Sequence, residues 1–174
     1  NSGLGKNSGL ELTLEKFLSK NYYFLLTTTL FDSKYRGSDG VWRNTAFNGN
    51  YTVNLLAGYE LPIKTDALAF NIKMVSAGGK RYIPINLEQS ILHGEAVYNY
   101  NEAYNPQFKG YFRVDLRISY RKNSRSISQE WSFDVQNLTN HDNIFMQRYD
   151  NHTQSVVNVL QMKFFPIGSW KIYF

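Results

Sequence analysis

The amino-acid sequence predicts an all-β protein whose antiparallel strands carry one apolar and one polar face. Apolar and polar residues alternate with a period of two along most of the 174 residues, which is typical of strands whose two faces meet different surroundings. Aromatic residues reach 16%, with 13 Tyr and 12 Phe, and together with β-branched residues they favour strands. Only four prolines interrupt the chain.

The first half of the chain contains four of the expected strands. The first alternates Leu10, Leu12 and Leu14 with Glu11, Thr13 and Glu15, and ends at a short turn over 19–21. The second, 22–31, is apolar on both faces, and a polar loop rich in turn formers follows it. The third and fourth alternate from Phe47 to Tyr59 and from Leu68 to Met74, on either side of a turn near Pro62.

The fifth and sixth strands form the clearest hairpin of the sequence. Residues 111–121 and 127–136 both alternate strictly between apolar and charged or polar residues. A two-residue turn at Asn123-Ser124 predicts their register. In that register four pairs face each other: Arg117 with Glu130, Arg113 with Asp134, Leu116 with Trp131, and Val114 with Phe133.

The seventh strand is expected to run from about 154 to the end of the chain. Leu160, Met162, Phe164, Trp170, Ile172 and Phe174 all have even numbers, so the alternation keeps its phase across Pro166 and Gly168. We therefore expect one long strand with a kink or bulge and not two separate strands.

Composition excludes several classes of protein. The absence of cysteine excludes a disulfide framework and thiolate metal sites. The net charge of +5 is scattered among acidic residues, which argues against a nucleic-acid partner. No apolar run approaches the roughly 18 residues of a spanning helix, although barrel strands escape such a search. The start of the chain resembles no signal peptide, so we expect either a cytosolic protein or a piece of a larger one.

Alternation alone is equally compatible with a soluble sheet that has one buried and one wet face. Three features favour a transmembrane barrel instead. The polar face is rich in charged and amide residues, as a water-filled lumen requires, and short turns alternate with long connections at 32–46, 77–110 and 139–153. Aromatic residues lie near strand ends, where an interfacial girdle would be: Tyr22, Tyr23, Tyr59, Tyr111, Trp170 and Tyr173. An odd count of about seven strands then predicts the closing arc of a larger barrel.

The chain resembles the C-terminal barrel portion of TonB-dependent outer-membrane receptors of the Bacteroidetes type. The matching stretches are GLELTLEKFLSKNYYFLLT, FDSKYRGSDGVWRNTAFNGNY, AGGKRYIPI, the hairpin YFRVDLRISYR to EWSFDVQNLTN, and FFPIGSWKIYF. The resemblance implies that residues 1–174 belong to a barrel of about 22 strands whose plug domain and early strands are absent. It also implies that NLTN at 137–140 closes the penultimate strand, and that the terminal Phe174 is the signal read by the outer-membrane assembly machinery.

The same resemblance implies a function and partners. The expected role is uptake of a scarce nutrient, whether a chelated metal, a glycan or a peptide, across the bacterial outer membrane. The expected partners are the lipid bilayer, the TonB complex through the missing N-terminal region, and a surface lipoprotein. The alternative is a soluble antiparallel β-sandwich or barrel that acts as a ligand-binding module.

No motif in the sequence indicates an enzyme, a cofactor or a metal site. Phosphate loops, GxSxG elbows and HExxH helices are missing, and the three histidines lie apart in expected loops. The longest loop is the best candidate for ligand binding, because Lys80, Arg81 and Tyr82 follow flexible glycines there. The alternative is that Arg81 and Tyr82 only pack that loop. Arg36 and Asp39 in RGSDG are further candidates, with a plain polar turn as the alternative.

Overall fold

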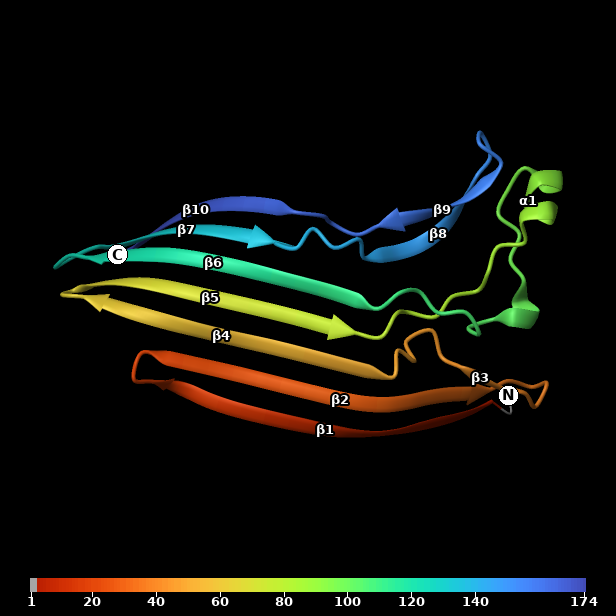
Figure 1. Cartoon of the computed structure of the whole chain (residues 1–174), viewed down its shortest axis with the longest axis horizontal. Coiled ribbons are helices and arrows are strands. Elements are labelled where there is room, and N and C mark those ends of the chain that lie inside the picture. Colours follow the sequence, from red (N-terminus) through yellow and green to blue (C-terminus); the bar gives the residue numbers. More distant parts are fainter. Residues whose placement is uncertain (1–2) are drawn as a thin grey trace.

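The computed structural model describes residues 3–174 as one curved antiparallel sheet with a cluster of loops at one end (Figure 1). Seven strands follow one another in the order β1-β2-β4-β5-β6-β7-β10. Their bounds are β1 (Leu4–Ser19), β2 (Tyr22–Arg36), β4 (Tyr51–Ile63), β5 (Asp66–Ala77), β6 (Tyr111–Asn123), β7 (Ser128–Gln136) and β10 (Phe165–Tyr173). The predicted all-β antiparallel fold is confirmed.

The smaller elements all lie at the loop end. The short strand β3 (Trp42–Asn44) pairs with β2, and β8 (Ile144–Asp150) forms a separate hairpin with β9 (Ser155–Leu160). The connection between β5 and β6 contains helix α1 (Leu87–His93) and the 3-10 helix η1 (Tyr100–Glu102). In the part of the chain that the structure describes, no helix has the length and apolar character needed to cross a membrane.

The opposite end of the sheet has only tight turns, as the sequence predicts. Ser19 pairs with Tyr22 across Lys20 and Asn21, which both have positive φ angles, as a type I′ hairpin turn requires. A two-residue connection also joins β4 to β5, and residues 124–127 join β6 to β7. Long and short connections therefore lie at opposite ends of the strands (Figure 1).

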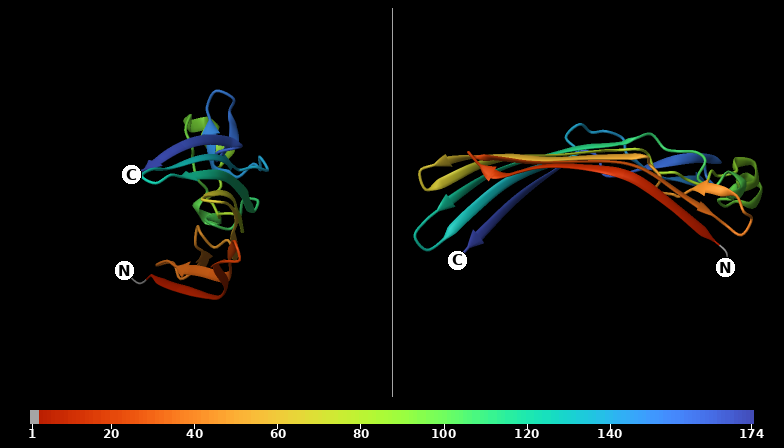
Figure 2. Two further views of the ribbon diagram at one scale, coloured as in Figure 1. Left: turned by 90° about the vertical axis from the view of Figure 1, so that its left-hand side faces the viewer. Right: turned by 90° about the horizontal axis from the view of Figure 1, so that it is seen from below.

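The sheet curls into an open arc, which Figure 2 shows from one end. The strands β1 and β10 form its two edges and do not pair with each other. Both edge strands run from the loop end to the tight-turn end (Figure 1).

The register sorts the side chains of all seven strands onto two chemically different faces. One row of paired residues crosses six strands on the convex face: Phe24, Ala57, Ile72, Leu116, Val135 and Pro166. The next row crosses the concave face: Tyr23, Gly58, Asn71, Arg117, Asp134 and Ile167. Because successive side chains of a strand point in opposite directions, the alternation seen in the sequence becomes a mostly apolar convex face and a mostly polar concave face.

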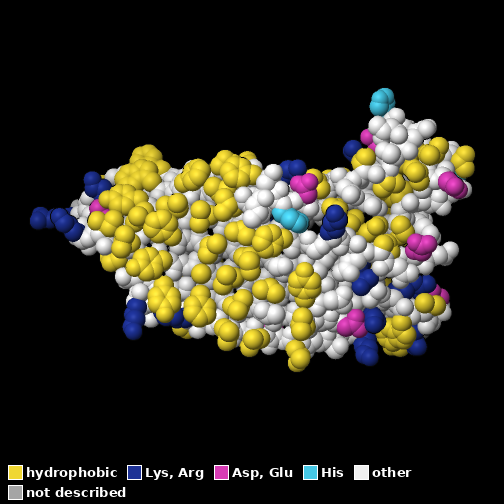
Figure 3. All heavy atoms as spheres, viewed as in Figure 1, with side chains coloured by type: hydrophobic (Ala, Val, Ile, Leu, Met, Phe, Trp, Pro, Cys, Tyr) yellow, Lys and Arg dark blue, Asp and Glu magenta, His cyan; other side chains and the backbone are white. Residues whose placement is uncertain are grey.

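The apolar face is exposed, because no second layer of the described chain lies over it. Figure 3 shows hydrophobic side chains gathered on this face over the strands, with charged side chains at the two ends. Phe133 is 53% exposed and Trp170 61%. The buried hydrophobic residues among those described are only Ala67, Ala103, Val135 and Tyr149. The sheet therefore has no core of the kind that two packed layers produce.

Two sequence-based expectations about strands are wrong. The hairpin between β6 and β7 pairs Asn123 with Ser128, because the Ser124 N–H donates to the Ile127 carbonyl and closes a four-residue loop. This loop moves β7 by four residues against β6, so Arg117 lies opposite Asp134 and not opposite Glu130. Since four is an even number, the two faces are unaffected.

The second wrong expectation is the single strand over 154–174. Its residues form β9 and β10, which pair with β8 and with β7 respectively. Residues 161–164 leave the ladder between them, where the Gln161 N–H donates to the Asn143 carbonyl and the Phe164 N–H to the Asn140 side chain. The alternation thus keeps the same phase although the chain passes from one sheet, with β9, to another, with β10.

Candidate functional site

The charged residues predicted to face a lumen form a cluster on the concave face, with one correction. The Arg117 guanidinium lies 2.9 Å from Glu130 and 3.4 Å from Asp134, so it bridges two carboxylates of β7. The predicted pair of Arg113 with Asp134 is wrong, because the four-residue shift carries Asp134 away. Arg113 instead lies 2.6 Å from Asp115 on its own strand.

The residues of the RGSDG loop contact their own neighbours and not each other. The Arg36 guanidinium lies over the ring of Trp42, 5.6 Å from its centroid. Asp39 accepts a hydrogen bond from the Val41 N–H and pairs with Arg43 at 2.6 Å. The Val41 N–H and the Arg43 guanidinium hold the pKa of the Asp39 carboxyl below its ordinary value. These contacts are those of a polar turn, the alternative reading of this segment.

Arg81 ties three loop segments together. Its Nε donates to the Asn48 carbonyl at 3.0 Å, and its Nη1 donates to the carbonyls of Tyr104 and Asn105 at 3.4 and 3.0 Å. Its backbone N–H donates to the Ala46 carbonyl. With its Nε and Nη1 directed at main-chain oxygens, Arg81 holds the loop framework, and it also lines a second hollow of about 260 Å³ together with Tyr82.

Tyr82 and Lys80 flank Arg81 and differ in their surroundings. The Tyr82 ring stacks on Phe108 with a centroid distance of 4.1 Å and an interplanar angle of 11°. The Lys80 ammonium lies 5.3 Å from the centroid of the Phe47 ring. Of the three loop candidates, Lys80 is the one that lines the hollow described next.

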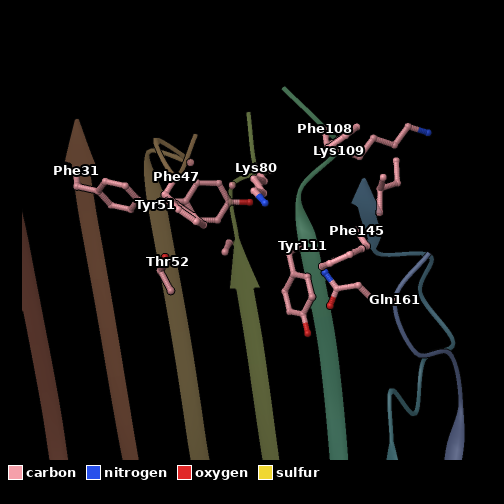
Figure 4. A pocket seen from close by; sticks show the side chains of 15 residues that line it. Phe31, Phe47, Tyr51, Thr52, Lys80, Phe108, Lys109, Tyr111, Phe145 and Gln161 are labelled. Atoms are coloured by element: carbon pink, nitrogen blue, oxygen red, sulfur yellow. The ribbon is translucent and has the colours of Figure 1, made fainter. Parts of the chain in front are cut away.

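That hollow, here called the mouth pocket, lies where strands β2, β4, β5 and β6 reach the loops (Figure 4). It has a volume of about 300 Å³. Phe31, Thr52, Ala77 and Tyr111 line it from the strands, and their register places all four on the concave face. The loops add Phe47, Lys80, Phe108, Lys109 and Gln161, and strand β8 adds Phe145.

Three glycines that line the mouth pocket, Gly49, Gly78 and Gly79, allow the loops to approach closely. A Cβ atom on Gly78 would lie 1.6 Å from the Gly49 carbonyl oxygen, and one on Gly79 would lie 1.9 Å from that of Phe108. Only glycine fits such a contact, since the opposing atoms belong to the main chain. The flexible glycines noted in the sequence are therefore sites of tight backbone packing.

The NLTN motif is a hydrogen-bonded corner directly after β7. Asn137, which is fully buried, donates from its side-chain nitrogen to the His141 and Met162 carbonyls and accepts from the His141 N–H. Asn137 and Asn140 both have positive φ angles, which Asn tolerates better than most residues. The corner joins the end of β7 to the segment that leads into β10.

Replacement of Asn137 by Asp tests this corner. The substitution keeps the shape of the side chain but removes two donors and places a carboxylate against two carbonyl oxygens. We expect the free energy of unfolding to fall by about 2–4 kcal/mol, measured by urea titration of the full chain. Asn158→Asp, on an exposed position of β9, is the matched control and is expected to change stability little. Equal effects of the two substitutions would contradict the role assigned to Asn137.

Sequence reasoning missed the aromatic part of the mouth pocket. Phe31, Tyr111 and Phe145 belong to three different elements, and nothing in their spacing indicates that they converge. A clue was available in the large number of aromatic residues at the loop-side ends of strands. The terminal Phe174 is fully exposed and lies one residue beyond β10. No group of three or more His, Asp or Glu side chains within residues 3–174 is arranged to hold a metal ion.

Comparison with known proteins gives no match to a family model, to a curated protein or to a solved structure. The chain's own geometry defines its class as an open antiparallel β-sheet with an uncovered apolar face and a loop-side pocket on its polar face.

Proposed function

We propose that this chain is part of the barrel wall of a TonB-dependent receptor, which imports a scarce nutrient across the outer membrane of a bacterium. The observation that carries the proposal is the apolar convex face, which crosses all seven strands without a covering layer in the described chain. In water such a face requires a second packed layer. Lipid chains cover it without one, because every inner strand already has its backbone groups paired.

The two edges of the sheet support a barrel larger than seven strands. Since β1 and β10 run in the same direction, a junction between them would be a parallel ladder. Bacterial outer-membrane barrels are antiparallel and have an even number of strands. Further strands must then pair with both edges, which fits the expected barrel of about 22 strands.

The opposite placement of long loops and tight turns supports one direction for the proposed barrel. Long loops of outer-membrane barrels face the outside and tight turns face the periplasm. The concave face, with Arg117, Glu130 and Asp134, would line the water-filled lumen. Strands of up to 16 residues exceed the roughly 9 to 11 that a bilayer requires. Under this proposal the TonB complex binds a region outside this chain, and a surface lipoprotein binds the loops. The outer-membrane assembly machinery recognises the strand that ends at Phe174.

Fluorescence quenching by brominated lipids tests the membrane assignment. Trp131 and Trp170 lie opposite each other on the convex face, whereas Trp42 lies in the loop-side strand β3. A Trp42→Phe chain reconstituted in brominated vesicles should lose most of its tryptophan emission, because both remaining rings contact acyl chains. A chain with Trp131→Phe and Trp170→Phe retains only Trp42 and should be quenched far less.

The competing proposal is a soluble antiparallel β-domain that binds a ligand. This alternative requires the convex face to be covered by another layer. Its expected result is a monodisperse monomer in plain buffer. That result, together with equal quenching of the two tryptophan variants, would overturn the membrane proposal. Partition into detergent and heat-modifiable migration on gels would support the membrane proposal.

A further inference from the structure

Aromatic rings dominate the mouth pocket. Six of its fifteen lining residues are aromatic: Phe31, Phe47, Tyr51, Phe108, Tyr111 and Phe145. They come from β2, β4, β6, β8 and two loops and line one hollow at the loop-side end of the strands (Figure 4). Phe31 and Tyr111 reach it from the concave face, whereas the register places Tyr51 on the convex side. Such walls favour a flat ring, which aromatic side chains contact in offset or edge-on geometry.

The charge in the mouth pocket is entirely positive. Lys80 and Lys109 line it, and no Asp or Glu does. Neither ammonium has a carboxylate within 4.0 Å among the described residues. In Figure 4 the Lys80 nitrogen lies among the rings, whereas the Lys109 side chain points away from them. Lys80 is therefore the group placed to meet an anion, and a carboxylate would give it a charge-assisted hydrogen bond.

The size and polarity of the pocket narrow the ligand further. A volume of about 300 Å³ lies at the lower end of the range for small-molecule sites. The remaining side-chain polar groups of the lining are few, namely the hydroxyls of Tyr51, Thr52 and Tyr111 and the amide of Gln161. A sugar would bury more hydroxyl groups than these can pair, and each unpaired one is unfavourable. A ring system with a single anionic group fits better.

The pocket is held in shape before any ligand arrives. Arg81 binds three loop carbonyls directly behind Lys80, and Gly78 and Gly79 lie in backbone contact with neighbouring loops. A preformed site loses little conformational freedom on binding. The loops that form it are thus fixed to the strands that carry Phe31 and Tyr111.

We propose that the mouth pocket binds an aromatic carboxylate of one or two rings, with Lys80 pairing with the carboxylate. The rings of Phe31, Phe108 and Phe145 contact the flat faces or edges of the ligand. This inference deepens the proposed function by naming the ligand class at the outer mouth of the barrel, and its biological role rests on that function. The pocket itself requires only the sheet and its loops.

Calorimetric titration of the folded full chain with 2-naphthoate tests the proposal. Two matched probes accompany it: 2-naphthamide, which keeps the rings without the charge, and glucuronate, which keeps the carboxylate on a sugar. We expect 2-naphthoate to bind at least tenfold more tightly than either probe. Equal or tighter binding of glucuronate would overturn the aromatic part of the proposal, and equal binding of 2-naphthamide would overturn the part assigned to Lys80.

Substitutions at Lys80 locate the binding. Lys80→Met should lower the affinity for 2-naphthoate about tenfold, to the level of the amide, while Lys122→Met at the tight-turn end should not change it. Lys80→Glu should abolish binding of 2-naphthoate and create binding of 2-(aminomethyl)naphthalene. Unchanged affinity in both Lys80 variants would overturn the proposal. Because the titration needs no bilayer, a chain that binds 2-naphthoate but is not quenched by brominated lipid would refute only the membrane assignment.

Discussion

A lysine in place of Ile118 is expected to prevent the chain from entering a bilayer. Ile118 lies in the middle of β6 on the convex face, between Phe70 of β5 and Phe133 of β7. It is 37% exposed, with only other strands of the same sheet beside it. A lysine on the lipid face near the bilayer centre costs about 2–4 kcal/mol in an outer-membrane barrel. The fraction of chain that becomes heat-modifiable and protease-resistant in vesicles should fall accordingly.

The neighbouring residue provides the control. Ser119 points to the concave face, between Ala69 and Ser132, so Ser119→Lys places the same charge one position along the same strand on the side proposed to be wet. We expect insertion of the Ser119→Lys chain to resemble that of the parent. If the two lysines impair insertion equally, the convex face is not the one that contacts lipid.

Alanine in place of Gly78 is expected to disrupt the loop end of the sheet. The added Cβ would lie 1.6 Å from the Gly49 oxygen and 2.6 Å from its carbonyl carbon, so two main-chain segments must separate. We expect the free energy of unfolding to fall by about 3 kcal/mol, measured by urea titration. Because both glycines line the mouth pocket, binding of 2-naphthoate should be lost as well.

Gly168→Ala is the matched control for that substitution. Gly168 lies in β10 opposite Phe133, and no atom lies within 4 Å of the position of its Cβ. Alanine in a strand interior is favoured over glycine by about 0.5–1 kcal/mol, so stability should stay level or rise slightly. A Gly168→Ala chain that is destabilised as strongly as the Gly78→Ala chain would contradict the close approach of the two loops.

The alternation of the sequence determined the strands and their faces by itself. Leu116 and Arg117 were assigned to opposite faces from their parity alone, and the register places them there. The reason is local, because the pleat of a strand sends neighbouring side chains to opposite sides whatever the partner strand is. The tight turns after Ser19 and Ile63 were predictable on similar grounds, from short polar segments between two alternating runs.

Only the tertiary structure decided which strand residues meet and what the loops build. A four-residue connection at 124–127 in place of the expected two-residue turn gave Arg117 two partners and separated Arg113 from Asp134. Parity cannot detect such a shift, since any even displacement leaves both faces unchanged. The mouth pocket and the carbonyl contacts of Arg81 likewise join segments more than 20 residues apart. Contacts over such separations depend on the curvature of the sheet and on the positions of its loops. A local pattern of residues determines neither the curvature nor these positions.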